Sequence, residues 1–232
     1  MGFSDSQHLR KTVAGTCMVL GPLLILAAFV ISPRLETDAA AQLRVAAEHV
    51  DRFYLVNMLA MVGVVLLVPA TLGLMHMVRE RRPAHGAIGG GLAMLGLFAT
   101  MVSFGLALAV WQMVSNGVQP GDVALLDSIN DAAGVQIPVA IVGFAGAIGF
   151  VVLMLGMYRA RVVDWWMALC AAAGIVMVNV AFPAGVLALA IAGSALLLVG
   201  LGAIGLMVVR ESDADWEHTP DYHGWRPAAG MS

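Results

Sequence analysis

The sequence predicts an all-α fold, a membrane bundle of six transmembrane helices with both termini in the cytoplasm. Of its 232 residues, 60% are hydrophobic and only 12% are charged, whereas a soluble domain carries about 25% charged residues. Apolar runs of about 20 residues, the length that crosses a bilayer as a helix, recur along the chain. Arginine clusters follow several of these runs. We therefore expect one membrane domain, residues 1–210, and a cytoplasmic polar tail, residues 211–232.

The first span is expected at residues 13–32, and the second, at residues 54–78, is the clearest in the chain. No small-residue cleavage site directly follows the first apolar run, so we expect it to be retained rather than removed as a signal peptide. The second run is almost wholly apolar from Leu55 to Met75 and is followed by a basic cluster, Arg79, Arg81 and Arg82. Such a cluster marks the cytoplasmic end of a span.

Four further spans are apolar runs bounded by polar residues or by a turn. They cover residues 87–111, 136–158, 165–182 and 186–209. Proline and glycine at residues 183–185 predict a tight turn between the last two. Residues 41–53 place apolar side chains at helical spacing, which predicts a short helix lying on the membrane before the second span. Another short helix is expected within residues 122–133.

Basic residues are distributed unevenly between the two ends of the predicted bundle. Six spans place both termini at one end, and eight basic residues lie near that end: Arg10, Lys11, Arg79, Arg81, Arg82, Arg159, Arg161 and Arg210. The opposite end has three, Arg34, Arg44 and Arg52. Because cytoplasmic segments carry the excess of Lys and Arg, we expect both termini in the cytoplasm, in a multi-pass protein of a bacterial plasma membrane.

A weak internal repeat relates the second and fourth spans at an offset of 80 residues. The matched pairs are Asp51 and Asp131, Gly63 and Gly143, Met77 and Met157, Arg79 and Arg159, and Arg81 and Arg161. Parallel repeats of this kind occur in transporters. All helices that cross the membrane in one direction also share anchoring residues, so the matches fit that simpler explanation as well.

His76 is the only histidine within a predicted span. It lies about ten residues, or roughly 15 Å, from the middle of the span, which is the depth of the lipid headgroups. A haem would need a second histidine on a facing helix, and the spans supply none. We therefore expect an interfacial histidine beside Arg79, with no cofactor and no metal. A proton-sensing pair with His85 is the alternative.

Polar and hinge positions within the spans are few, and no Asp, Glu, Lys or Arg falls in a predicted hydrocarbon core. This absence disfavours ion-coupled transporters and proton pumps. Asn179 is the deepest amide, and it is expected either to form an interhelical hydrogen bond worth about 0.6 kcal/mol or to line a small polar cavity with Ser194. Pro69 removes a backbone donor from the carbonyl of Val65, which predicts a kink in the second span.

One face of the fourth span consists of small residues, which predicts close contact with another helix. Its members are Ala140, Gly143, Gly146, Ala147 and Gly149. The partner helix belongs either to the same chain or to another. The tail combines His218 and His223 with acidic residues at a spacing that matches no standard metal site, so we expect it to be solvated. Trp216 in the tail is suited to rest on the membrane or to dock on a partner.

The segment GLMHMVRERRPAHGAIGGGLAMLG, residues 73–96, resembles the connection between the second and third helices of uncharacterised six-helix integral membrane proteins from GC-rich bacteria. The resemblance covers most of the membrane domain. It implies the same six-helix architecture, and it carries over no functional residue.

Several function classes are disfavoured by missing motifs. The chain has no Walker loop, HExxH, GxSxG or CxxC, and its net charge of −3 gives no reason to expect a nucleic-acid partner. The leading hypothesis is a non-enzymatic subunit, scaffold or regulator that associates with another membrane protein or with itself in the lipid bilayer. The alternative is a small transporter or channel for a weakly polar or lipidic solute, which would use Pro69 and the Asn179 region. An intramembrane enzyme is the third hypothesis.

Overall fold

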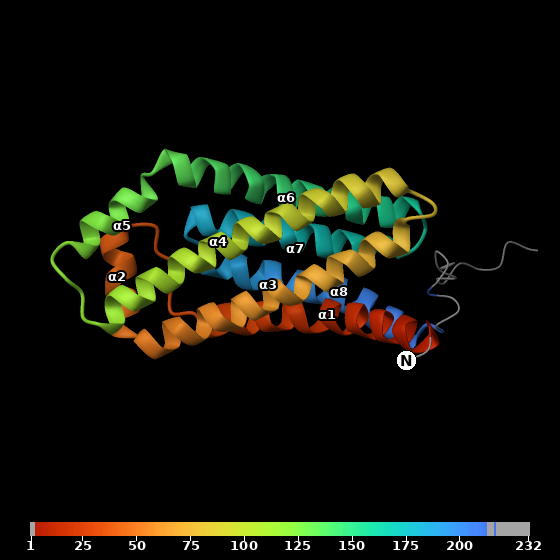
Figure 1. Ribbon diagram of the computed structural model, residues 1–232, viewed down its shortest axis with the longest axis horizontal. Helices are drawn as coiled ribbons and strands as arrows, with labels where there is room; N and C mark the ends of the chain where they lie inside the picture. The colour runs from red at the N-terminus through yellow and green to blue at the C-terminus, as the bar shows by residue number, and fades with distance from the viewer. Residues whose placement is uncertain (1–2, 213–215, 217–232) are drawn as a thin grey trace, which may run out of the picture.

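The computed structural model describes residues 3–212 and residue 216, and every regular element in them is helical (Figure 1). The elements are α1 (Phe3–Ile31), α2 (Ala39–Glu48), α3 (Val50–Val78), the π-helical turn η1 (His85–Gly89), α4 (Gly90–Ser115), α5 (Asp122–Asn130), α6 (Ala133–Arg159), α7 (Trp165–Ala184) and α8 (Leu187–Arg210). Six are long and apolar enough to cross a membrane, namely α1, α3, α4 with η1, α6, α7 and α8. The predicted all-α bundle of six membrane spans is confirmed.

The spanning helices form a ring in which neighbours along the chain are also neighbours in space. Contacts run from α1 to α3, α4, α6, α7 and α8 in turn, and α8 returns to α1. The short helices α2 and α5 lie together at one end of this ring (Figure 1). We call this end the cap end, and the opposite end, where α1 begins and α8 ends, the terminal end. Both ends of the bundle sequence thus lie on one side, as an even number of spans requires.

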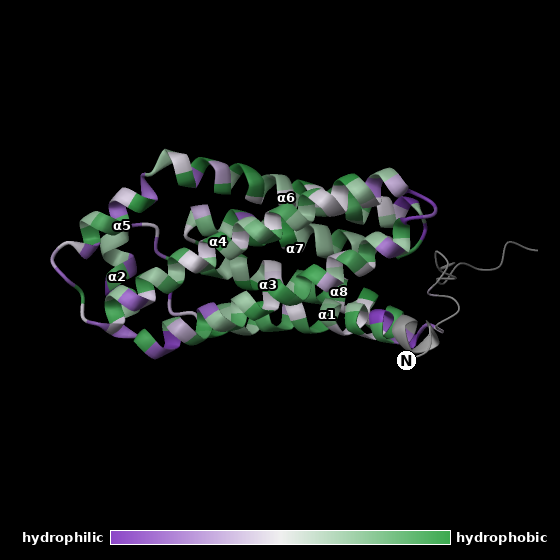
Figure 2. Ribbon diagram, in the orientation of Figure 1, coloured by the Kyte–Doolittle hydropathy of each residue, from purple (hydrophilic) through white to green (hydrophobic). Residues whose placement is uncertain are grey.

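Residues along the spans are mainly hydrophobic, and hydrophilic residues gather at the turns and at the two ends of the bundle (Figure 2). Large side chains such as Ile141 and Ile148 are more than 60% exposed on α6. Apolar surface of this extent is rare on a protein that faces water. A hydrocarbon solvent around the ring explains it, because lipid tails are as apolar as these side chains.

The packed core of the ring lies in its terminal half. With the exception of Leu43 in α2, the largest fully buried side chains are Met18, Leu74, Met77, Val78, Leu153, Met154, Met157, Val162, Leu197, Leu201 and Ile204. These residues come from the second half of α3 and α6, from the middle and second half of α8, from the middle of α1, and from the turn after α6. Dense packing at one end leaves the cap half of the ring less filled.

The short helices occur where the sequence predicts them, but two boundaries differ from expectation. Only His49 separates α2 from α3, so the predicted surface helix at residues 41–53 is divided between the two. Helix α7 continues through Pro183 to Ala184, and Gly185 makes the turn with φ of 64°. Proline is tolerated in the last turn because it removes one hydrogen bond while keeping a helical φ.

Helix α3 continues through Pro69 from Val50 to Val78. The hydroxyl of Thr71 donates to the carbonyl of Leu67 over 2.8 Å, a bond that often bends helices. The predicted kink at Pro69 remains a prediction.

Candidate ligand cavity

The cap half of the ring contains a partly open cavity of about 540 Å³. All six spanning helices line it, together with α2, α5 and the loop of residues 32–36. Each spanning helix contributes residues from its cap half or its middle, for example Phe29 of α1, Phe104 of α4, Val178 of α7 and Leu197 of α8. The volume falls within the range of small-molecule sites, about 300–1,000 Å³.

The cavity is elongated along the bundle axis. Its lining on α3 extends from Phe53 to Leu67, a rise of roughly 21 Å at 1.5 Å per residue. A smaller cavity of about 40 Å³ adjoins it on the side of the packed core. Thr100 and Asn179 are among the residues that line both cavities and therefore lie where the two meet. The main cavity thus extends from the cap end to near the middle of the spans.

Four polar side chains line the main cavity within the spans, and each donates a hydrogen bond inside its own helix. Asn57 donates to the carbonyl of Phe53 over 2.8 Å, and Thr100 to that of Gly96 over 2.9 Å. The same pattern holds for Ser103 with Ala99 at 3.4 Å and Asn179 with Ile175 at 2.9 Å. The charged residues among the described lining, Arg34 and Glu36, belong to the cap-end loop.

Asn179 and Ser194 were predicted as a possible pair that lines a polar cavity, but only Asn179 lines a cavity in the structure. Asn179 lines both cavities, whereas Ser194 is fully buried and donates to the carbonyl of Ile191 in α8 over 3.0 Å. Ser194 lines neither cavity. The amide of Asn179 donates to the carbonyl of Ile175 within α7. This hydrogen bond lies inside one helix, whereas a bond between two helices was expected from the sequence.

The small-residue face of α6 contacts α4 along one part and faces the main cavity along another. A Cβ atom on Gly146 would lie 2.3 Å from the Cα atom of Gly96, and one on Gly149 would lie 2.7 Å from the backbone nitrogen of Ala93. Both contacts are with α4 of the same chain. By contrast, a Cβ atom on Gly143 would meet nothing within 4 Å, and Gly143 lines the main cavity together with Ala140. Ala147 is buried and lines the small cavity.

The cap half of α6 forms an open side of the cavity. No residue from Ala133 to Ala145 is buried, and the first buried residue of α6 is Gly146. At the terminal end, in contrast, a short turn of residues 160–164 holds α6 against α7. The wall of the cavity near Phe144 is therefore a single helix whose other face is apolar and exposed.

The cap end of the cavity is covered by a second apolar cluster that is separate from the main core. It consists of Ala39, Leu43 and Ala46 of α2, Val110 and Val114 of α4, and Leu126 of α5. The side chain of Gln42 donates to the carbonyl of Glu36 over 2.8 Å, which attaches the loop to α2. This cover is thus a small packed unit of its own.

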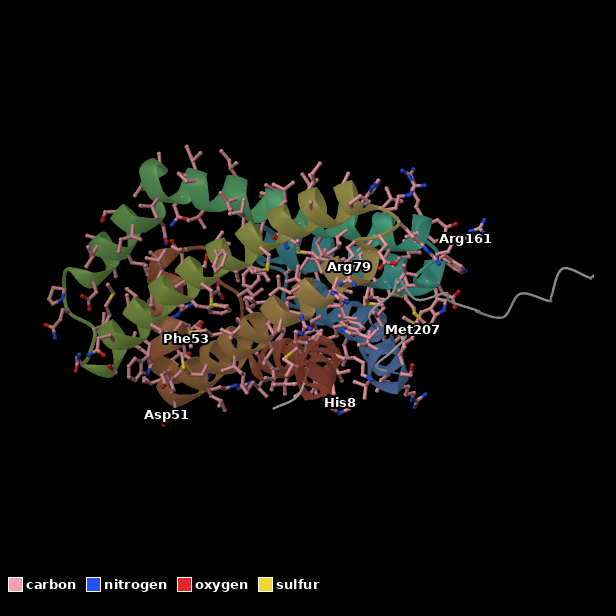
Figure 3. The ribbon with its side chains drawn as sticks, turned by 45° about the vertical axis from the view of Figure 1, so that its right-hand side comes forward. His8, Asp51, Phe53, Arg79, Arg161 and Met207 are labelled. Carbon is pink, nitrogen blue, oxygen red and sulfur yellow. The ribbon has the colours of Figure 1, made fainter. Side chains whose placement is uncertain are left out.

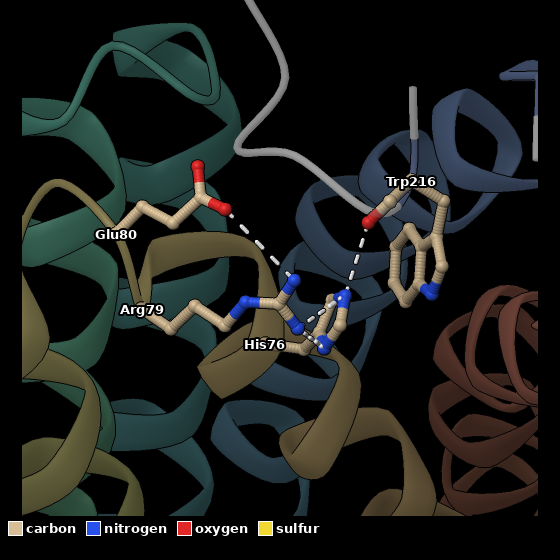
Figure 4. Close-up of polar contacts among 4 residues, drawn as sticks. All are labelled: His76, Arg79, Glu80 and Trp216. Atoms are coloured by element: carbon tan, nitrogen blue, oxygen red, sulfur yellow. Dashed lines mark hydrogen bonds and ion pairs between the residues drawn. The ribbon is translucent and has the colours of Figure 1, made fainter. Parts of the chain in front are cut away.

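His76 lies away from both cavities, in the last turn of α3 near the terminal end. Figure 3 shows the two ends of the bundle, with Asp51 and Phe53 opposite to Arg79 and Arg161. The ring of His76 stacks on that of Trp216, and its Nε2 lies 3.0 Å from the carbonyl oxygen of Trp216 (Figure 4). Arg79 contacts the imidazole and also lies 3.9 Å from a carboxylate oxygen of Glu80.

The environment of His76 differs from the expectation in one respect. It does lie beside Arg79, but Trp216 covers one face of its ring, and Trp216 is only 4% exposed. The solvated tail expected from the sequence therefore does not include Trp216, while His218 and His223 lie outside the described residues. His85 lies against α6, because a Cβ atom added to Gly156 would be 2.4 Å from the Cβ atom of His85. The proton-sensing pair of His76 and His85 stays a prediction.

Comparison of the chain with protein-family models, with curated proteins and with solved structures gave no match. Within residues 3–212 and residue 216, no group of three or more His, Cys, Asp or Glu side chains is placed to hold a metal ion. The resemblance to six-helix proteins of GC-rich bacteria remains an expectation.

Proposed function

We propose that this protein binds a weakly polar or lipidic solute in its central cavity and acts as a small transporter for it. The observation that carries the proposal is a mainly apolar cavity of about 540 Å³ lined by all six spans. Unfilled apolar space destabilises a packed core in proportion to its volume. A solute that fills this space would therefore stabilise the bundle.

The lining supports an uncharged solute. Arg34 and Glu36 lie at the cap end, and the remaining described lining residues are apolar or neutral. A charged group in the deeper part would lose its hydration without gaining a partner of opposite charge, which is costly at membrane depth. The cavity therefore favours solutes that already partition into the bilayer.

The open side at α6 supports entry from the lipid. Residues 133–145 of α6 carry no buried position, and Phe144 lines the cavity while remaining 48% exposed. A lipidic solute in the leaflet at the cap end reaches the cavity past this helix without crossing water. Release at the terminal end requires the packed half of the ring to rearrange.

The orientation of the protein in the membrane and its association with another protein are proposals separate from solute transport. We infer that the terminal end faces the cytoplasm of a plasma membrane, because basic residues such as Arg82 and Arg159 follow the spans there. Association with another membrane protein has less support, because the contacts of Gly146 and Gly149 lie within the chain. A stable partner that co-purifies from native membranes would restore it.

Filling the cavity tests the proposal. The protein is placed in lipid nanodiscs and titrated with aminoanthracene, a small uncharged probe whose emission rises in apolar surroundings, with empty nanodiscs as background. Gly143→Phe fills open space in the cavity, and Gly105→Phe places the same side chain in open space on α4, outside the lining. We expect saturable binding that Gly143→Phe reduces at least tenfold and Gly105→Phe leaves unchanged. Equal binding by both variants would contradict the proposal.

Transport is measured with the same pair of variants. Proteoliposomes that contain the parent protein should exchange a radiolabelled long-chain alcohol with acceptor vesicles faster than empty liposomes do, and Gly143→Phe should remove the difference. Saturable binding without faster exchange would restrict the function to binding.

A further inference from the structure

We propose that the solute is an uncharged, long-chain molecule with a hydroxyl group that donates a hydrogen bond at the junction of the two cavities, beside Asn179 and Thr100. This inference rests on the proposed function and names the chemical class that the same cavity selects. It is carried by the hydrogen-bonding state of the polar lining.

Within the spans, the hydroxyl groups of the lining have no donor left for a ligand. Thr100 gives its only hydroxyl proton to the carbonyl of Gly96 at 2.9 Å, and Ser103 gives its proton to Ala99 at 3.4 Å. A hydroxyl oxygen whose proton is used still accepts through its lone pairs. Both side chains therefore present acceptors to the cavity.

The amide of Asn179 adds further acceptor capacity at the same depth. One N–H group bonds to the carbonyl of Ile175 at 2.9 Å, which leaves the side-chain oxygen and one N–H group. Pro183, four residues later, has no backbone N–H, so the backbone carbonyl of Asn179 lacks its usual helical donor. Acceptors thus outnumber donors around Asn179 and Thr100.

An acceptor that faces an apolar cavity without a donor has lost its hydration, and this loss raises the free energy of the folded protein. A ligand hydroxyl supplies the missing donor, whereas an ether oxygen is only an acceptor and a carboxylate is an acceptor with a negative charge. An ammonium group would also donate, but no described carboxylate lines the cavity at this depth to balance its charge. The lining therefore favours a neutral hydroxyl group over these alternatives.

The sizes of the two cavities orient the ligand. The small cavity of about 40 Å³ has space for water or a hydroxyl group but not for a chain. The main cavity extends from the junction toward the cap end and holds about 540 Å³. The hydroxyl group accordingly lies near mid-span, and the hydrocarbon chain lies along α3 and α4 toward the cap.

Matched ligands test this inference in the unmodified protein. Dodecanol, dodecyl methyl ether and dodecanoate compete with bound aminoanthracene in nanodiscs, with partitioning into empty nanodiscs subtracted. We expect dodecanol to displace the probe at a concentration at least tenfold lower than the ether or dodecanoate. Equal potency of alcohol and ether, or tighter binding of dodecanoate, would overturn the inference while leaving the proposed function intact. Failure of the probe to bind saturably would instead reject the proposed function.

Variants at the junction of the two cavities test whether Asn179 and Thr100 cause the preference for the alcohol over the ether. Asn179→Leu and Thr100→Val should each reduce the alcohol-to-ether ratio to threefold or less. Asn116→Leu is the matched control, because Asn116 also donates to the carbonyl four residues earlier, that of Gln112 at 3.1 Å, but lines neither cavity. The control should keep the full ratio. An unchanged ratio in both junction variants would show that another group binds the hydroxyl and would overturn the assignment.

Discussion

The imidazole of His76 stacks on the indole of Trp216, with ring centroids 4.9 Å apart and planes inclined by 17°. This contact joins the end of α3 to the segment that follows α8, although α1 lies between α3 and α8 in the ring. The Nζ atom of Lys11 in α1 donates to the carbonyl of Glu211 over 2.7 Å. Three helices are therefore held together at the terminal end by the residues just beyond α8.

Replacing His76 with alanine should release Trp216 from the bundle. The variant loses an aromatic contact worth about 1 kcal/mol and a hydrogen bond worth about 1 kcal/mol. Emission from Trp216, obtained as the difference between each protein and its Trp216→Phe counterpart, should become several-fold more sensitive to iodide quenching. His49→Ala, at an exposed position at the cap end, is the control. The absorption spectrum should be unchanged, and a Soret band in the parent that His76→Ala removes would contradict the interfacial assignment of His76.

Arg81 should stabilise the turn after α6. Its guanidinium donates to the carbonyl of Ala160, the residue that follows α6, over 3.0 Å. Arg81→Ala should lower the free energy of unfolding by about 1–2 kcal/mol, because a typical hydrogen bond contributes about 1 kcal/mol and one that involves a charged group contributes somewhat more. Thermal unfolding in detergent measures the effect, and the neighbouring Arg82→Ala should have little effect. Equal effects of the two substitutions would mean that the contact with Ala160 contributes nothing specific.

Two alanine substitutions on the same face of α6 should have opposite outcomes. In Gly146→Ala, the new methyl group meets the backbone of Gly96 at 2.3 Å, and α4 and α6 must separate. Overpacking of this kind costs about 1–3 kcal/mol. Gly143→Ala adds a methyl group in open space and should be neutral or slightly stabilising. Thermal unfolding of both variants side by side decides the matter, and a tolerated Gly146→Ala would contradict the close approach of α4 and α6.

Cysteine labelling should place the two ends of the ring on opposite sides of the membrane. Ala84, in the turn between α3 and η1, and Ala124, in α5, are exposed at the terminal end and the cap end respectively. In a chain whose Cys17 and Cys170 are replaced by alanine, a membrane-impermeant maleimide applied to intact cells should label position 124 and not position 84. Permeabilised cells should show both. Labelling of both positions in intact cells would refute the orientation or the number of spans.

The spans were predictable because each depends on a local property, the length of an apolar run. The third span, expected at residues 87–111, is observed from His85 to Ser115, and the others also agree to within a few residues, apart from an earlier start of α1. The π-helical turn η1 was not predictable in this way. Gly89, its last residue, and Gly90, the first residue of α4, lie against other helices, where a Cβ atom would lie 2.7 Å from the backbone of Leu153 and 2.3 Å from the side chain of Met75 respectively. Such contacts exist only after the helices have assembled.

The cavity could not be predicted because its lining is drawn from nearly the whole length of the chain. Ile25 and Leu197 both contribute to it, and no local pattern connects them. Two signals were present. Asn179 was a conspicuous amide at membrane depth, and Gly143 belonged to a face of small residues whose other members suggested only helix contact. Gly143 differs from Gly146 solely in what lies opposite, which is open space in one case and α4 in the other.

Because the spanning helices form a closed ring, their packing contacts do not depend on which helix comes first in the chain. The order of the spans around the ring is their order in the sequence, and α8 lies against α1, with Lys11 bonded to the carbonyl of Glu211. Joining the ends of α1 and α8 with a linker and cutting the loop of residues 117–121 would preserve every helix neighbour. Circular permutation should therefore leave the bundle and its cavity intact while moving both termini across the membrane to the cap end.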